Sequence, residues 1–145
     1  EGTGLIRRFV GHDASFPNIT AAIAHLRAVL PTMSLDGEEA WRAMAMLTYA
    51  PDGTGTLRPL WDTRIGRLLN GKAPDLWALF GGLAHLPLLL VHGEVSNILL
   101  SPTIAHMQEI RPDMKLARLP NVGHAPTLTE PEVLAALREF IGTLA

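Results

Sequence analysis

Residues 86–93 read Leu86-Pro87-Leu88-Leu89-Leu90-Val91-His92-Gly93, and this stretch decides the fold. It is a short, continuously apolar run that ends at a glycine. Such a run is typical of a strand that is buried on both faces of a parallel sheet, although the pattern alone also allows a segment of a buried helix. Because parallel strands need a crossover connection, a helix and a second strand should follow it in the sequence.

The residues after this run predict both elements. Ser101-Pro102 predicts a helix start, with serine as the cap and proline in the first turn, and Arg111-Pro112 predicts its end. Residues 114–119 then alternate apolar with polar or small side chains, as a strand does. A final helix should begin at Thr129-Glu130-Pro131-Glu132, which has capping-box spacing. The order strand, helix, strand, helix predicts an α/β fold, a parallel sheet with helices on both faces.

The residues before the run predict helices, because their apolar positions recur at helical spacing. Asn18 is a suitable cap for a helix that Pro31 ends, and a second helix should begin near Asp36. We therefore expect a helical part over residues 1–84 and a βαβα part over residues 85–145. Further breaks in the helical part predict a loop over residues 51–55 and short helices over residues 62–69 and 75–83.

The composition excludes several classes of protein. The chain has 145 residues, of which 48% are hydrophobic and 18% charged, with a net charge of -2 and no cysteine. A chain this close to neutral lacks the basic surface that a nucleic-acid partner needs. The longest apolar run is far shorter than the roughly 18 residues of a membrane span, so we expect no membrane partner. Without thiolates, and with no shared ligand spacing among the histidines, we expect no metal and no cofactor.

Two loops should leave the same edge of the predicted sheet. Pro120-Asn121-Val122-Gly123-His124-Ala125-Pro126 follows the second strand, and His92-Gly93-Glu94-Val95-Ser96-Asn97-Ile98-Leu99-Leu100-Ser101 follows the first. In open α/β sheets, functional groups gather at the carboxyl ends of strands. The two loops are therefore the candidate site.

The order of these features resembles the carboxyl-terminal half of the α/β-hydrolase superfamily, over residues 87–145. In many members the penultimate strand ends in a Gly-Glu-x-Ser-Asp-x-Leu-Ser-like loop that supplies the acid of a catalytic triad. The last strand is followed by Gly-His-Ala-Pro and then by Glu-Pro at the start of the final helix. The matching features here are Gly93–Ser101, Gly123-His124-Ala125-Pro126 and Glu130-Pro131. More loosely, the helices of residues 1–84 resemble the cap that these enzymes insert over the active site.

The resemblance implies roles for individual residues. His124 matches the catalytic base, and Asn97 stands where the family has its acid. An asparagine can accept a hydrogen bond from an imidazole, but it carries no charge to stabilise the imidazolium. Glu94 and Asp113 are alternative acids, as is a carboxylate after the sixth strand, upstream of this sequence. The substrate-binding candidates are Trp41, Met44, Ile98 and Ala125, and packing in the core is an equal alternative for Trp41 and Met44.

The sequence contains no Gly-x-Ser-x-Gly nucleophile motif. In this family the nucleophile precedes the acid and the histidine, so the resemblance implies that it lies upstream of Glu1. We therefore expect the chain to be the carboxyl-terminal half of a serine hydrolase, incomplete and inactive alone. Its partner would be the amino-terminal half, joined covalently or as a separate chain, and a homodimer is also open. The strand over residues 88–91, apolar on both faces, likewise calls for neighbouring strands.

The expected reaction is hydrolysis of a small apolar carbonyl substrate in the cytoplasm. An ester, a lactone and the C–C bond of a diketone all suit such chemistry, and the fold alone does not choose among them. Dehalogenases and epoxide hydrolases share the fold as well. The alternative function is a non-catalytic binding protein that kept the pocket and lost its triad acid, for which Asn97 is the motivating residue.

Overall fold

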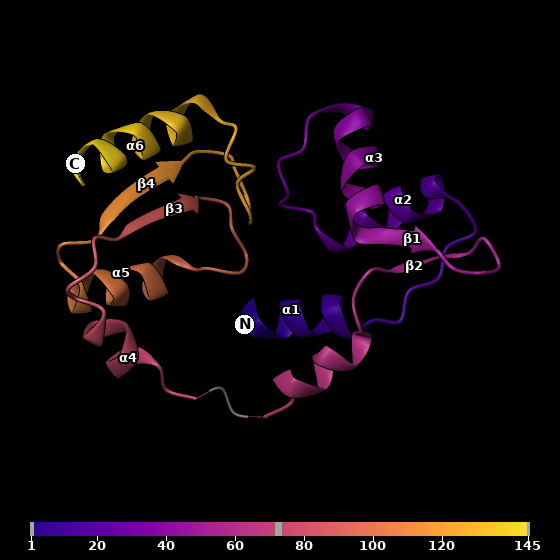
Figure 1. The fold of residues 1–145 in the computed structure, drawn as a ribbon, viewed down its shortest axis with the longest axis horizontal. Coiled ribbons are helices and arrows are strands. Elements are labelled where there is room, and N and C mark those ends of the chain that lie inside the picture. Colours follow the sequence, from indigo (N-terminus) through magenta and orange to yellow (C-terminus); the bar gives the residue numbers. More distant parts are fainter. Residues whose placement is uncertain (1, 72–73, 145) are drawn as a thin grey trace. The chain divides into compact units, whose positions relative to one another are not determined.

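The computed structural model describes residues 2–71 and 74–144, which fall mainly into two compact units, Thr3–Lys72 and Ala73–Ala145 (Figure 1). The boundary predicted from the sequence lies after residue 84, whereas helix α4 (Trp77–Gly82) belongs to the second unit in the structure. Each unit has its own secondary structure and is described by itself.

The first unit is built around two packed helices. Alanine and leucine side chains on one face of α2 (Ile19–Val29) bury themselves against α3 (Gly37–Thr48), and Leu26 and Ala45 are fully buried. The predicted cap is confirmed, since the Asn18 side chain accepts a hydrogen bond from the Ala21 amide at 3.0 Å. The remaining elements are α1 (Gly2–Gly11), strands β1 (Tyr49–Pro51) and β2 (Leu57–Pro59), and the 3-10 helix η1 (Thr63–Leu69).

The loop predicted over residues 51–55 is the turn of an antiparallel hairpin between β1 and β2. The Asp52 carboxylate holds this turn together. Its Oδ1 accepts hydrogen bonds from the amides of Thr54 at 2.8 Å and Thr56 at 3.2 Å, and its Oδ2 accepts one from Arg58 Nε at 3.2 Å. These bonds, the Thr54 contacts foremost, lower the pKa of Asp52 to about 2.

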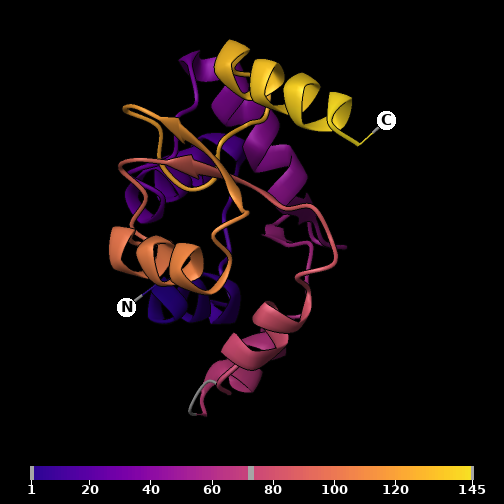
Figure 2. The same cartoon turned by 90° about the vertical axis from the view of Figure 1, so that its left-hand side faces the viewer.

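The second unit has the predicted order of elements. Strands β3 (Leu89–Gly93) and β4 (Lys115–Leu119) pair in parallel, with Leu89 opposite Lys115 and Gly93 opposite Leu119. Helix α5 (Ser101–Ile110) connects the two strands, and α6 (Pro131–Gly142) follows the second. Figures 1 and 2 show α5 and α6 on opposite faces of the two strands. The prediction of a parallel sheet covered by helices on both faces is confirmed within this unit.

The caps of these two helices differ from prediction. Ser101 lies inside α5, whose N-cap is Leu100. The N-cap of α6 is Glu130, which makes no side-chain cap bond. Its carboxylate instead accepts a hydrogen bond from the Thr127 amide at 2.8 Å, so the predicted capping box is absent. Both prolines stand in the first turn of their helices, as predicted.

The buried side chain of Arg111 joins the segments that precede the two strands of the second unit. The Arg111 side chain is 2% exposed, and its guanidinium donates hydrogen bonds to the carbonyl oxygens of Leu83 at 2.9 Å and Leu86 at 2.7 Å. It also forms two bonds with the Asp113 carboxylate. Arg111 thereby fixes the segment that leads into β3 against the turn that leads into β4.

Candidate active site

The two predicted site loops leave the same edge of the β3–β4 pair. Residues 94–100, which we name the acid loop, follow β3, and residues 120–126, the histidine loop, follow β4. Main-chain hydrogen bonds join them: the Glu94 amide donates to the Leu119 carbonyl at 2.9 Å, and the Val95 amide donates to the Val122 carbonyl at 3.1 Å. The loops are therefore held together by backbone, whatever side chains they carry.

Gly93 brings the two loops close enough for these bonds. A Cβ at this position would overlap the carbonyl oxygens of Val122 and Gly123 and would lie 2.7 Å from the Val122 carbonyl carbon. All these atoms belong to the backbone, which cannot swing away as a flexible side chain does. Only glycine allows the histidine loop to pass this close to the end of β3.

The acid loop is also braced internally. The Ser96 amide donates to the Gly93 carbonyl at 3.0 Å, and Ser96 Oγ accepts hydrogen bonds from the amides of Ile98 at 3.2 Å and Leu99 at 3.1 Å. His92 Nε2 lies 3.0 Å from the Leu99 carbonyl oxygen. These contacts fix the loop on both sides of Asn97.

The structure places four of the predicted site residues on these loops. His124 and Ala125 are exposed on the histidine loop, and Asn97 and Ile98 are half-buried on the acid loop. The joined loops bring these two pairs to one edge of the sheet. Their roles as base, acid position and substrate contacts stay predictions.

The two alternative acids of this unit lie in different places. Asp113 precedes β4 and therefore sits at the amino edge of the strands, opposite the histidine loop. Its bonds from Arg111 hold the pKa of that carboxyl below its ordinary value. Glu94 is exposed at the start of the acid loop. Asp113 is thus committed to the fold at the wrong end of the sheet to assist His124.

Trp41 and Met44 lie in the first unit. Trp41 is 8% exposed and belongs to the core between α2 and α3, with the Arg27 guanidinium 5.4 Å from its ring centre. Met44 is half-buried against the same core. These positions fit the packing alternative, and the proposed role of both residues in substrate binding stays a prediction.

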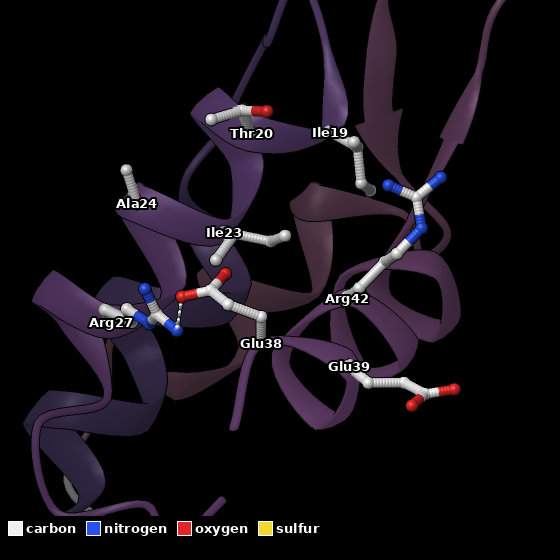
Figure 3. A pocket seen from close by; sticks show the side chains of 8 residues that line it. All are labelled: Ile19, Thr20, Ile23, Ala24, Arg27, Glu38, Glu39 and Arg42. Atoms are coloured by element: carbon white, nitrogen blue, oxygen red, sulfur yellow. Dashed lines mark hydrogen bonds and ion pairs between the residues drawn. The ribbon is translucent and has the colours of Figure 1, made fainter. Parts of the chain in front are cut away.

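A groove of about 650 Å³ opens between α2 and α3. Figure 3 shows apolar side chains of α2 along it and charged side chains beside them, with Arg27 and Glu38 joined by a salt bridge of 2.6 Å. Its lining residues are Ile19, Thr20, Ile23, Ala24, Arg27, Glu38, Glu39 and Arg42. The lining includes neither a histidine nor any predicted site residue.

The described residues contain neither a candidate metal site nor a candidate membrane-spanning helix. Over residues 2–71 and 74–144, no cluster of three or more His, Asp or Glu side chains is arranged to bind a metal ion. No helix in the same ranges has the length and apolar character that crossing a membrane requires.

Comparisons with individual known proteins identify the family, although no family model matches the chain. The chain is 26% identical over 148 residues to a 3-hydroxybutyrate-oligomer hydrolase of Cupriavidus necator, covering 93% of this chain and 50% of that protein. It is 30% identical over 128 residues to a 2-(acetamidomethylene)succinate hydrolase of Mesorhizobium japonicum, covering 87% of this chain and 44% of that protein.

A similar solved structure belongs to a hydrolase as well. The crystal structure of an α/β hydrolase from Novosphingobium aromaticivorans superimposes with a TM-score of 0.78 at 34% identity, over 97% of this chain and 51% of that one. The chain belongs to the α/β-hydrolase superfamily. The predicted resemblance is therefore confirmed, and this α/β-hydrolase chain spans about half the length of the curated relatives it matches.

Sequence reasoning missed part of what shapes the site of this α/β hydrolase. Gly93 marked only the end of a strand, yet it sets the spacing of the two loops. In the sequence, His92 stands out only as a polar residue at the end of an apolar strand, and its partner lies seven residues later in the acid loop. A polar residue inside an apolar strand must find a hydrogen-bond partner when buried, and that rule is the signal that points to His92.

Proposed function

We propose that this α/β-hydrolase chain forms the carboxyl-terminal half of a serine hydrolase that cleaves a small apolar carbonyl compound, either an ester, a lactone or the C–C bond of a diketone. The observation that carries the proposal is the backbone joining of the histidine loop to the acid loop at the carboxyl edge of β3 and β4. The two curated relatives are named as a 3-hydroxybutyrate-oligomer hydrolase and a 2-(acetamidomethylene)succinate hydrolase, which supports hydrolysis as the type of reaction.

In the proposed mechanism His124 moves the proton. A serine hydroxyl of a companion segment attacks the substrate carbonyl carbon, and the His124 imidazole takes the hydroxyl proton. Backbone amides stabilise the resulting oxyanion. When the tetrahedral intermediate collapses, His124 gives the proton to the leaving group. Water then attacks the acyl-enzyme in the same way and releases the acid. The exposure of His124 on its loop leaves the imidazole accessible to a substrate.

The companion segment would be the amino-terminal half, in the same polypeptide or as a separate chain. Two features of the second unit support it. Among the described residues β3 pairs only with β4, so its other edge offers unpaired backbone groups. Around α4, Leu76, Leu79 and Leu83 are 55%, 69% and 47% exposed, an apolar surface suited to packing against further elements. A second copy of the chain is the alternative occupant.

A non-catalytic binding protein is the second candidate function, because Asn97 would leave the imidazolium without a stabilising charge. Covalent labelling separates the two. The chain combined with its amino-terminal half should react with a fluorophosphonate probe at a serine, and His124→Ala should abolish the labelling. His85→Ala, which alters an exposed histidine outside both loops, should label normally. An unlabelled wild-type protein would support the binding function, and undiminished labelling of His124→Ala would refute the role of His124.

A further inference from the structure

His92 is a buried histidine that the proposed mechanism does not use. It lies on β3 directly before Gly93, and 3% of its surface is exposed. The Leu99 carbonyl oxygen, 3.0 Å from its Nε2, can only accept a hydrogen bond. Nε2 therefore carries a proton and donates it. Nδ1 is buried and has no hydrogen-bond partner among the described residues. The single bond to Leu99 is thus the polar contact that accounts for a histidine at this position.

This bond closes the acid loop at its far end. The start of the loop is held by the amides of Glu94 and Val95, which donate to the carbonyls of Leu119 and Val122. The end is held by His92 through Leu99. Ser96 Oγ, which accepts from the amides of Ile98 and Leu99, braces the segment between them.

Asn97 lies inside this frame, between Ser96 and Ile98. Without the His92 bond, the carbonyl of Leu99 would lose its side-chain partner. The Leu99 amide would still donate to Ser96 Oγ, and the Leu100 carbonyl would still accept from the amides of Thr103 and Ile104 at the start of α5. A displacement of about 1 Å at a catalytic group lowers turnover by up to about 100-fold. His92 therefore supplies one of the bonds that hold the end of the loop next to Asn97.

We propose that His92 is a positioning residue for Asn97, acting through its hydrogen bond to Leu99. The proposal rests on the proposed function, since it assigns Asn97 to the acid position beside His124. Its two parts are testable separately. The hydrogen-exchange rates of the loop amides report whether His92 stabilises the loop. The value of kcat reports whether that stabilisation affects the reaction.

The test uses His92→Leu, which removes the donor and keeps an apolar side chain of similar bulk, and His92→Gln, whose amide nitrogen can replace Nε2. In the protein combined with its amino-terminal half, His92→Leu should raise hydrogen exchange at Ile98 and Leu99 about tenfold or more. It should lower kcat roughly ten- to 100-fold with KM changed less than about threefold. His92→Gln should recover most of both losses, and His85→Leu, at an exposed position, should match the wild type.

Each outcome decides one part. Unchanged loop exchange in His92→Leu would overturn the proposal. Raised exchange with unchanged kcat would show that the loop is held but that Asn97 needs no positioning, and the proposed function would stand. If the wild type hydrolyses nothing, the proposed function fails while exchange still tests the hold on the loop. If His92→Leu does not fold, Ser96→Ala is the second variant, because it removes the hydroxyl that accepts hydrogen bonds from the amides of Ile98 and Leu99. Unchanged exchange and unchanged kcat in Ser96→Ala would refute the proposal that side-chain bonds to this loop position Asn97.

Discussion

The Cα of Gly93 lies against the carbonyl group of Val122, so close that a Cβ would stand 2.7 Å from the Val122 carbonyl carbon. One residue at the end of β3 therefore sets how near the histidine loop comes to the acid loop. This contact joins the buried end of β3 to the loop that carries the exposed His124.

Gly93→Ala should displace the histidine loop. The added methyl meets only backbone, so the loop must shift, and overpacking of this kind typically costs about 1–3 kcal/mol. We expect a lower free energy of unfolding and a loss of fluorophosphonate labelling in the combined protein. Gly53→Ala is the matched control, since a Cβ there meets nothing within 4 Å and both variants change the unfolded chain equally. Equal stability of the two variants would contradict the close contact.

Asn97→Asp should raise turnover, because a carboxylate at the acid position stabilises the imidazolium and fixes the tautomer of His124. The reverse exchange costs about 10⁴ in serine proteases, and we expect a gain of at least about tenfold here. The pH–rate profile should shift its acidic limb to higher pH, since the added charge favours protonated histidine.

A flat or reduced turnover in Asn97→Asp would have a different cause. A carboxylate supplied by the companion segment would already serve His124, and a second negative charge beside it would raise the pKa of one of the two. If turnover, KM and the profile all stay unchanged, Asn97 does not lie beside His124.

Arg111→Met should destabilise the second unit. The Leu86 carbonyl and the Asp113 carboxylate would lose the bonds from the guanidinium, and the Leu83 carbonyl would keep the bond from the Leu86 amide. We expect the melting temperature to fall by roughly 10 °C. The control is Arg138→Met, on the exposed surface of α6, which should melt within about 2 °C of the wild type. A similar small change in both variants would show that the buried guanidinium contributes little.

Asp52 should make stability depend on pH. Its folded pKa of about 2 lies below the ordinary value of 3.8, so its contribution is present above about pH 4 and is lost as the pH falls toward 2. Asp52→Asn should therefore lower the urea midpoint at neutral pH, and the difference from wild type should shrink near pH 2. Asp36→Asn is the control, because the Asp36 side chain makes no cap bond. A difference that stays constant with pH would exclude the charge of Asp52 as its cause.

The chain without a companion segment should not behave as a monodisperse monomer. One edge of β3 has no partner strand among the residues that the structure describes, and this edge and the exposed leucines around α4 favour association. Size-exclusion chromatography with light scattering should show higher species, and coexpression with the amino-terminal half should replace them with a single complex. A cooperatively melting monomer would contradict this expectation.

The sequence predicts the second unit well, because its signals are local. An apolar run ending in Gly93 and prolines at helix starts identify the strands and helices without any tertiary information. Helix α1 was missed for the opposite reason. Its sequence contains three glycines, which are poor helix formers, and the helix is held from outside. Trp61 donates a hydrogen bond to the Val10 carbonyl at 2.7 Å, and its ring packs against Phe9.

The hairpin and the site geometry were also beyond the sequence. Strands of three residues, such as β1 and β2, carry too little alternation to be recognised. At the site, the family pattern locates His124 and Asn97, but the spacing of their loops depends on contacts between residues some thirty positions apart, such as Val95 and Val122.

The main-chain nature of those contacts has a consequence for variation at the site. The bonds from Glu94 and Val95 to the carbonyls of Leu119 and Val122 involve no side-chain atom, so any residue other than proline can donate them. The loops can therefore change their chemistry without losing their mutual placement. An exchange of Asn97 for an acidic residue during evolution would change the charge of the site. The main-chain bonds that hold the two loops together would remain.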